Sequence, residues 1–339
     1  MNQNRLDWSR ILVRIHPDDL PLDQPQIFEG KGGWSGAVFW QWPAKSGSRL
    51  LKIWPYDGPT EDQHISRHRR LDCLRGWRIP LAIPIPDLSG NTLRRWHDGR
   101  FAELIPWIPG QPISTIRSEK HVSLVADQLA LLHEKWRLSS SFTRQRSRAI
   151  TSRLQQLRMI RKNNPCEPLQ KTLEKCCHHG TSAFIKLQMI IQNARLLIDT
   201  AIEELEPFEN CGFRSQAILR DARPDQFFFD KGNPSGVIDF GAVGTDAISV
   251  DLARLTGDWF PDSSHYVSYF LSSYEKKYRL EAVEQDSIKP LALSGAILGG
   301  LAWIDLHFVK KRTYGRDQEF TEALDRALLR INTFLENDF

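Results

Sequence analysis

The sequence predicts an α+β fold with two lobes, a β-rich N-terminal lobe followed by a mainly helical C-terminal lobe. Strand-forming runs separated by turn residues dominate residues 25–55. Beyond Pro112, apolar residues recur at the spacing of helices instead. A length of 339 residues suits one large bilobal unit or two ordinary domains. We therefore expect one bilobal unit, with residues 1–107 as the N-terminal lobe and residues 108–339 as the C-terminal lobe.

The N-terminal lobe should be built around a β-hairpin whose strands are rich in aromatic and branched side chains. Turn-forming residues separate the two strands. The expected elements, in chain order, are a glycine cluster (30–36), the hairpin strands (38–42 and 49–54), a helix closed by Arg75 and Gly76 (61–74), a strand (100–105) and a proline-stiffened connector (106–110).

The C-terminal lobe begins with a helix over 119–136, in which valines and leucines recur at helical spacing. Two more helices are expected over 144–161 and 183–205. A polar, β-rich stretch over 217–255 follows, and the final third of the chain is again helical.

The composition is that of an ordinary globular protein, with 41% hydrophobic and 25% charged residues. Its 45 basic residues nearly balance 41 acidic ones, which excludes a disordered chain. The 21 glycines and 19 prolines follow no period, so collagen-like and low-complexity fibres are excluded as well.

The chain shows no sequence feature of a membrane or secreted protein. Its longest uncharged apolar stretch, 290–304, is shorter than the roughly 20 residues of a spanning helix. Charges interrupt the N-terminus, and five cysteines are an odd number, so we expect reduced thiols and a cytoplasmic location. Residues 176–179 read Cys-Cys-His-His, but adjacent ligands lack the spacing of a zinc site, which favours a solvated loop.

Positive charge is concentrated in residues 141–175, which hold nine Lys or Arg and two Glu. Such a segment can meet phosphates or an acidic partner, but a solvated helix face is the interpretation we favour. The chain has no basic stripe with interleaved aromatic residues, so we expect no nucleic-acid partner.

The stretch over 217–255 carries two carboxylates in a suggestive arrangement. Asp221 precedes a predicted hairpin strand (227–229), and Asp239 follows its partner strand (236–238), across a turn over 230–235. Because a hairpin returns the chain to its starting side, both carboxylates can face one cleft. Phosphoryl transfer needs such a pair, one acid to orient the attacking hydroxyl and one to hold Mg²⁺.

The motifs in this stretch resemble those of a known family. Residues 219–226 read LRDARPDQ and are similar to the H-R-D-x-K-P-x-N catalytic loop of the protein-kinase-like fold, and 239–241 match its D-F-G. The aminoglycoside phosphotransferase and choline kinase family is the closer relative, because its later D-L-A and its L-A-x-L-H are matched at 251–253 and 129–133. The resemblance covers about residues 28–260.

This resemblance implies a protein-kinase-like bilobal fold that moves the γ-phosphoryl of ATP or GTP to a hydroxyl of a small molecule. Asp221 would be the catalytic base, and Gln226 and Asp239 would hold Mg²⁺. Arg223 would either pair with the γ-phosphate or form a surface pair with Asp225 or Asp221. The helical C-lobe, where the family reads its acceptor, matches least, so the sequence names neither the acceptor nor an oligomeric state.

Two positions depart from the family pattern. The first His of the catalytic loop is Leu219, which can only pack. The metal-binding Asn is Gln226, whose amide oxygen sits one methylene further out, and the neighbouring Asp225 is a possible substitute.

The N-terminal lobe supplies the nucleotide clamp that the resemblance implies. Gly33, Gly36 and Val38 fit G-x-G-x-x-G-x-V, while Lys31, with Gly32 next to it, replaces the first glycine. Lys52, fourteen residues after Val38, stands where the ATP-binding lysine belongs. Its usual glutamate partner on the next helix would be Glu61, although the register itself points to Ile65.

Two other interpretations stay open. The departures at Leu219 and Gln226 fit a catalytically silent nucleotide-binding protein, a pseudokinase. Arg220 and Arg223 fit a protein kinase, but no A-P-E element follows Asp239, which disfavours that reading.

Overall fold

The computed structural model describes residues 8–28, 34–77, 79–113, 118–139, 143–163, 182–313 and 316–336. The chain divides into two compact units. Unit 1 comprises residues 1–112 and 226–241, and unit 2 comprises residues 113–225 and 242–339. The hairpin of residues 226–241 therefore belongs with the N-terminal sheet, although it lies far along the chain.

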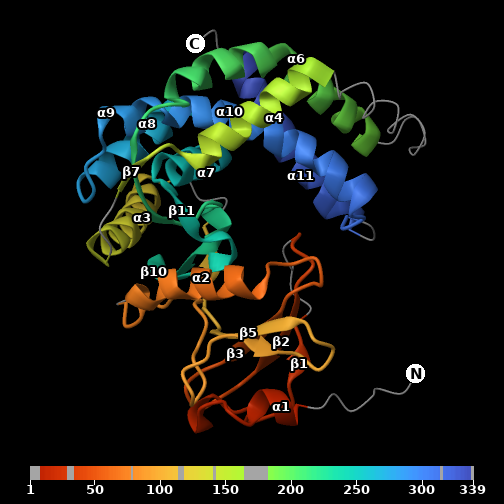
Figure 1. Ribbon diagram of the computed structural model, residues 1–339, viewed down its shortest axis with the longest axis vertical. Helices are drawn as coiled ribbons and strands as arrows, with labels where there is room; N and C mark the ends of the chain where they lie inside the picture. The colour runs from red at the N-terminus through yellow and green to blue at the C-terminus, as the bar shows by residue number, and fades with distance from the viewer. Residues whose placement is uncertain are drawn as a thin grey trace. The chain divides into compact units, whose positions relative to one another are not determined.

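Unit 1 is built on a five-stranded antiparallel sheet in the order β1-β2-β3-β5-β4 (Figure 1). The hairpin predicted from sequence is confirmed, since Val38 pairs with Ile53 and Trp42 pairs with Arg49. The strands are β1 (Gln26–Ile27), β2 (Val38–Trp42), β3 (Arg49–Ile53), β4 (Arg94–Arg95) and β5 (Phe101–Pro106).

The core of this sheet explains its stability. Trp42, Leu51 and Leu104 are fully buried, and Ile11 and Ile15 from the N-terminal segment pack against them. The segment begins with the short helix α1 (Ser9–Leu12) and the 3₁₀ turn η1 (Pro17–Asp19). Burying large aromatic and branched side chains removes apolar surface from water, which is the main favourable contribution to folding.

The helix α2 (Glu61–Leu71) starts where local chemistry predicts. Thr60 and Gln63 form a reciprocal capping box at its N-terminus. Its end is three residues earlier than expected, because the 3₁₀ turn η2 (Asp72–Leu74) replaces its last turn. Gly76 then adopts φ +73°, a left-handed conformation that glycine takes without steric cost.

A second sheet of unit 1 has the order β10-β9-β6, formed by β6 (Gln111–Pro112), β9 (Phe227–Asp230) and β10 (Asn233–Val237). The predicted six-residue turn is wrong in length. Lys231 and Gly232 alone make the turn, at φ +49° and +79°, which suits the twist of a two-residue hairpin. Pro234 is accommodated inside β10 because this is an edge strand with a register shift between Pro234 and Gly236.

Unit 2 is mainly helical, with a small antiparallel sheet in the order β11-β8-β7 (Figure 1). Its longer helices pack pairwise, α10 against α6, α7 and α11, and α3 against α8. The helices are α3 (Glu119–Ser139), α4 (Arg148–Asn163), α6 (Ser182–Leu205), α7 (Ser249–Trp259), α8 (Ser264–Glu275), α9 (Ala282–Asp286), α10 (Ile288–Ile304), the π-helical η6 (Asp305–Val309) and α11 (Asp317–Glu336). The strands are β7 (Thr143–Gln145), β8 (Phe213–Ile218) and β11 (Gly244–Ala247), with the short turn η3 (Glu206–Phe208). The turns η4 (Pro224–Gln226) and η5 (Phe240–Ala242) contain the two points at which the chain passes from one unit to the other.

The basic segment differs from the predicted helix over 144–161. Thr143–Gln145 forms β7 on β8, so the helix α4 starts only at Arg148. Residues 164–181, with Cys166 and the sequence 176–179, lie outside the described residues. Cys73 and Cys211, which the structure describes, are free thiols.

One stretch of the described residues, Ala282–Phe308, has the length and composition of a membrane span: it holds 27 residues, and an 18-residue window within it has a mean hydropathy of 1.5. It contains α10, which packs against three other helices of unit 2. Such packing is that of an apolar core helix.

Candidate active site

The lysine of unit 1 that the sequence analysis singled out lies beside the acid of the Asp-Phe-Gly sequence. Lys52 on β3 is buried, and its Nζ lies 3.7 Å from Oδ1 of Asp239. Nζ also lies 4.0 Å from the centroid of the Trp54 ring, a cation–π contact. The structure thus brings together two of the residues singled out from the sequence.

The backbone around Asp239 is unusual. Asp239 has φ +62°, which is uncommon for a residue other than glycine and often marks a functional site. A Cβ on Gly241 would lie 3.1 Å from Oδ1 of Asp239 and 3.5 Å from Nζ of Lys52. A side chain at position 241 would therefore crowd the pair.

The glycine loop is only partly described. Gly36 adopts φ +76°, and Val38 begins β2 with 38% of its surface exposed. Gly32 and Gly33 lie outside the described residues.

Glu61 does not lie against Lys52 in this structure. Its Oε2 pairs with Nη2 of Arg95 at 2.6 Å, and both side chains are more than half exposed. Its position in the first turn of α2 places it at the surface.

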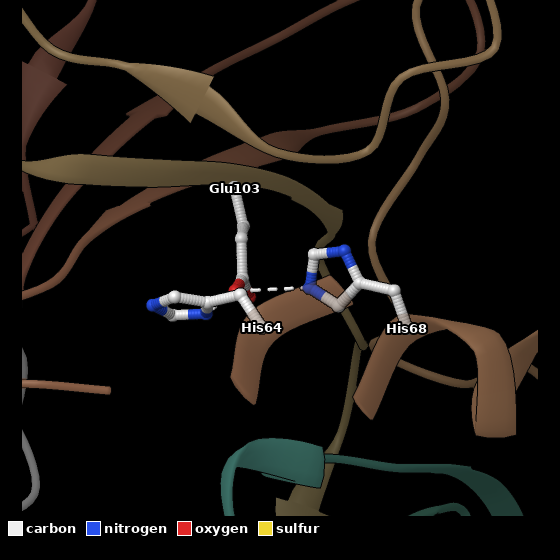
Figure 2. A group of neighbouring side chains, drawn as sticks. All are labelled: His64, His68 and Glu103. Atoms are coloured by element: carbon white, nitrogen blue, oxygen red, sulfur yellow. Dashed lines mark hydrogen bonds and ion pairs between the residues drawn. The ribbon is translucent and has the colours of Figure 1, made fainter. Parts of the chain in front are cut away.

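The buried acid on the lysine's face of the sheet is Glu103. Glu103 on β5 is the cross-strand partner of Lys52, so both side chains project from the same face. Three residues of α2 surround its carboxylate, namely His64, Arg67 and His68. We call these four residues the Glu103 cluster. Figure 2 shows both imidazole rings turned toward the carboxylate.

The Glu103 cluster offers three possible metal ligands, because one donor atom each of His64, His68 and Glu103 lies within 4.8 Å of the others. Nη2 of Arg67, however, lies 2.9 Å from Nδ1 of His64 and 3.0 Å from Nε2 of His68, and it contacts Oε1 of Glu103. The guanidinium therefore occupies the centre that a metal ion would need, and the cation of this cluster is Arg67.

The electrostatics of Glu103 agree with that conclusion. Burial alone would raise the pKa of Glu103, but hydrogen bonds with His64 and His68 and the charge of Arg67 hold it well below its usual value. Glu103 is thus a buried, ionised carboxylate, and the cluster fastens α2 to the sheet.

In unit 2, the loop that carries Asp221 is held by Asp251. The fully buried carboxylate of Asp251 accepts hydrogen bonds from the backbone N–H groups of Leu219, at 2.7 Å, and Arg220, at 2.6 Å. His133 lies 3.1 Å from Asp251 through Nε2 and 2.7 Å from the Tyr274 hydroxyl through Nδ1. The Asp-Leu-Ala and Leu-His sequences thus serve to position the loop, which bends at Arg220 with φ +67°.

The carboxylate of Asp221 is 45% exposed and faces two arginines. Nε of Arg254, on α7, donates to its Oδ1 at 2.9 Å, and Nε of Arg223 lies 3.5 Å from its Oδ2. Arg223 also lies 3.6 Å from Oδ2 of Asp225. The sequence left two roles open for Arg223, a contact with the γ-phosphate or a surface ion pair. In this structure Arg223 forms ion pairs with both Asp221 and Asp225.

Gln226 and Asp239 supply the oxygen donors that Mg²⁺ prefers. Gln226 is 2% exposed, and its backbone carbonyl accepts a hydrogen bond from the N–H of Ile238 at 3.0 Å. That bond ties the metal-binding candidate at 226 to the residue before Asp239. A carboxamide oxygen and a carboxylate are hard ligands, so this pair fits a magnesium ion.

Sequence reasoning missed Arg254 and the Glu103 cluster. Arg254 lies one helical turn after Asp251, and this spacing was a usable signal that both residues share a face of α7. No local signal marks Glu103, whose partners come from a helix more than 30 residues earlier in the chain.

Comparison with known proteins places the chain among phosphotransferases. The Phosphotransferase enzyme family matches residues 29–284. A homoserine kinase from Rhodopseudomonas palustris (strain BisA53) is 38% identical over 86 residues, which are 24% of this chain and 26% of that protein. The match thus spans about a quarter of the relative's length.

Solved structures share the fold over nearly the whole chain. An amicoumacin kinase in complex with AMP-PNP and Ca²⁺ is 12% identical, covers 96% of this chain and 93% of its own, and has a TM-score of 0.62. A spectinomycin phosphotransferase in complex with ADP is 11% identical, covers 98% of both chains, and has a TM-score of 0.57. At these identities the likeness concerns the fold, and it confirms the predicted kinase-like α+β fold.

Proposed function

The chain belongs to the phosphotransferase enzyme family, and we propose that it transfers the γ-phosphoryl group of ATP or GTP to a hydroxyl of a small molecule. The pairing of Lys52 with Asp239 at 3.7 Å is the observation that carries this proposal. It joins the lysine that neutralises nucleotide phosphates to the acid that holds their metal ion.

The residues take distinct parts in the proposed reaction. Asp221 orients the acceptor hydroxyl and accepts its proton, while the acceptor oxygen forms a bond to the γ-phosphorus. The bond between that phosphorus and the β,γ-bridging oxygen breaks, and ADP or GDP leaves. Gln226 and Asp239 would hold Mg²⁺, which neutralises phosphate charge when bound. The free thiols of Cys73 and Cys211 support a cytoplasmic location.

The nucleotide part of the proposal is tested by thermal shift. Mg-ATP should raise the melting temperature of the wild-type protein, because a ligand that binds only the folded state stabilises it. Lys52→Ala should blunt this rise. A wild-type protein that shows no rise with either millimolar Mg-ATP or millimolar Mg-GTP contradicts the proposal and the pseudokinase alternative together.

The metal part is tested at position 226. Gln226→Asn keeps a carboxamide oxygen and shortens the side chain toward the family pattern, so activity should be kept or improved. Gln226→Leu removes the oxygen and should abolish activity. Unchanged activity in Gln226→Leu, measured over a Mg²⁺ titration, would assign the coordination to Asp225 or water instead.

The pseudokinase alternative rests on one observation of unit 2. Without a substrate, the proposed base Asp221 is already paired with Arg254 and Arg223. A protein that binds Mg-ATP but shows no turnover with any acceptor or with water would favour this alternative.

A further inference from the structure

The charges beside Asp221 form a connected group in unit 2. Arg254 joins Asp221, at 2.9 Å, to Asp258, at 3.2 Å, and Nη1 of Arg330 on α11 lies 3.1 Å from the same oxygen of Asp258. We call Asp221, Arg254, Asp258 and Arg330 the Asp258 cluster. A continuous series of ion pairs thus connects the half-exposed proposed base, Asp221, with the buried Arg330.

Further arginines lie within electrostatic reach of this cluster. Four arginines, at positions 223, 254, 326 and 330, act on Asp258. A fifth, Arg153, lies within the electrostatic reach of Arg254 and Arg330. The carboxylates of Asp221, Asp225 and Asp258 act on Arg254, and that of Asp246 acts on Arg153.

Arg330 carries an unsatisfied hydrogen-bond donor of this cluster. Its side chain is nine-tenths buried, and its Nε has no hydrogen-bond partner among the described residues. Burial lowers the pKa of Arg330 to about 10, although Asp258 opposes the shift. A buried guanidinium nitrogen without an acceptor is costly, and an oxyanion removes that cost.

We propose that the acceptor is a hydroxylated acid, whose carboxylate is bound by Arg254 and Arg330 while its hydroxyl meets Asp221. The proposal rests on the phosphotransferase function above and narrows its substrate class. A carboxylate supplies the acceptor oxygen that Nε of Arg330 lacks within the described part of the chain. Arginine also pairs with a carboxylate through two parallel hydrogen bonds, which fixes the acceptor's orientation.

Binding of such an acid has a consequence for the base. Arg254 donates its Nε to Asp221 in the ligand-free protein. A carboxylate that takes over Arg254 relieves Asp221 of this hydrogen bond, so the base becomes available only when the right acceptor is present. A polycationic acceptor would instead meet arginines and be repelled.

The experiment uses pairs of acceptors that differ by one carboxylate. L-homoserine is compared with 3-amino-1-propanol, L-serine with ethanolamine, and D-glycerate with ethylene glycol. Thermal shift of the wild-type protein with Mg-ATP and ATP consumption are both measured. The acids should stabilise the protein or be phosphorylated, and their decarboxylated counterparts should not. A further pair, sn-glycerol 3-phosphate and glycerol, tests whether the bound anion is a phosphate. A preference for sn-glycerol 3-phosphate over the carboxylic acids would contradict the proposal that the acceptor carries a carboxylate.

Variants connect the effect to the cluster. Arg330→Gln should raise the KM or midpoint for the acid by about 10- to 100-fold, the loss expected for a hydrogen bond to a charged group. Arg330→Lys keeps the charge and should lose less. Arg161→Gln removes an arginine from an exposed ion pair with Asp199 in the same unit and should match the wild type. The wild-type comparison stands even if Arg330→Gln does not fold.

The outcomes separate this inference from the proposed function. If Mg-ATP stabilises the protein but amino alcohols are preferred over acids, or neither set has an effect, the acidic acceptor is wrong and nucleotide binding stands. If acids stabilise the protein and Arg330→Gln responds equally well, the cluster is not the binding site. If Mg-ATP itself has no effect, the proposed function fails first.

Discussion

Each of the two units contains a carboxylate surrounded by nitrogen-bearing side chains. The two clusters differ in solvent exposure: one is buried throughout, and the other has a member that is partly exposed. In the Glu103 cluster every member is buried, and Arg67 fills the centre. In the Asp258 cluster the chain of charges runs from Arg330 to Asp221, whose side chain is 45% exposed. A closed cluster of this kind holds a helix to a sheet, whereas an open one can exchange its internal partner for a ligand.

The largest effect is expected at the open end. Asp221→Asn keeps the shape of the side chain and removes the base, which should lower turnover by roughly 10²–10⁴ while Mg-ATP still binds. Asp239→Asn should weaken both turnover and binding, because it removes a charge from the metal site. Steady-state kinetics and thermal shift on the two variants give the comparison. Undiminished turnover in Asp221→Asn would show that another residue takes the proton.

The closed cluster should respond in stability rather than in turnover. Glu103→Gln leaves the buried guanidinium of Arg67 without its counter-charge, which should cost about 3–5 kcal/mol of unfolding free energy. Denaturant unfolding measures this loss. A variant as stable as the wild type would mean that Arg67 finds another acceptor.

The same carboxylate predicts a pH dependence. Because the pKa of Glu103 is lowered in the folded protein, its stabilisation is complete above the unfolded-state value of about 4.3 and is lost as the pH falls below it. The free energy of unfolding of the wild type should therefore decline more steeply below pH 4 than that of Glu103→Gln. Equal slopes would contradict an ionised Glu103.

The smallest effect is expected for the exposed pair of Glu61 and Arg95. Glu61→Gln should change the unfolding free energy by less than about 1 kcal/mol, since exposed ion pairs are screened by water. The Mg-ATP midpoint should stay as in the wild type. A marked loss of nucleotide binding would restore Glu61 as the partner of Lys52, as its place in the sequence first indicated.

The parts of this structure that were predictable from sequence are those encoded by local spacing. The hairpin of β2 and β3 follows from alternating strand formers around a turn, and Lys52 and Asp239 follow from motif positions. The turn at Lys231 and Gly232 was misjudged because Pro234 usually ends a strand, and its tolerance here depends on β10 being an edge.

What sequence could not reveal depends on contacts between distant segments. Glu103 looks like any polar residue of a strand until register places it opposite Lys52 and beneath α2. The pairing of Thr143–Gln145 with β8, which delays the start of α4, likewise has no signature in three polar residues. Arg254 lies between these two cases. Its helical spacing from Asp251 is visible in the sequence, but its hydrogen bond to Asp221 is not.

The placement of Asp251 and Arg254 on successive turns of α7 has a consequence for how the proposed acceptor specificity can change. One residue anchors the loop that bears Asp221, and the other is the ion-pair partner of Asp221 itself. A mutation at Arg254 that admits a new acceptor therefore also disturbs the proposed base, and selection would act on both effects at once. The ion-pair partner of Arg330 is Asp258, so a change at position 330 leaves the hydrogen bond from Arg254 to Asp221 in place. Directed evolution of acceptor choice should accordingly proceed through position 330 before position 254.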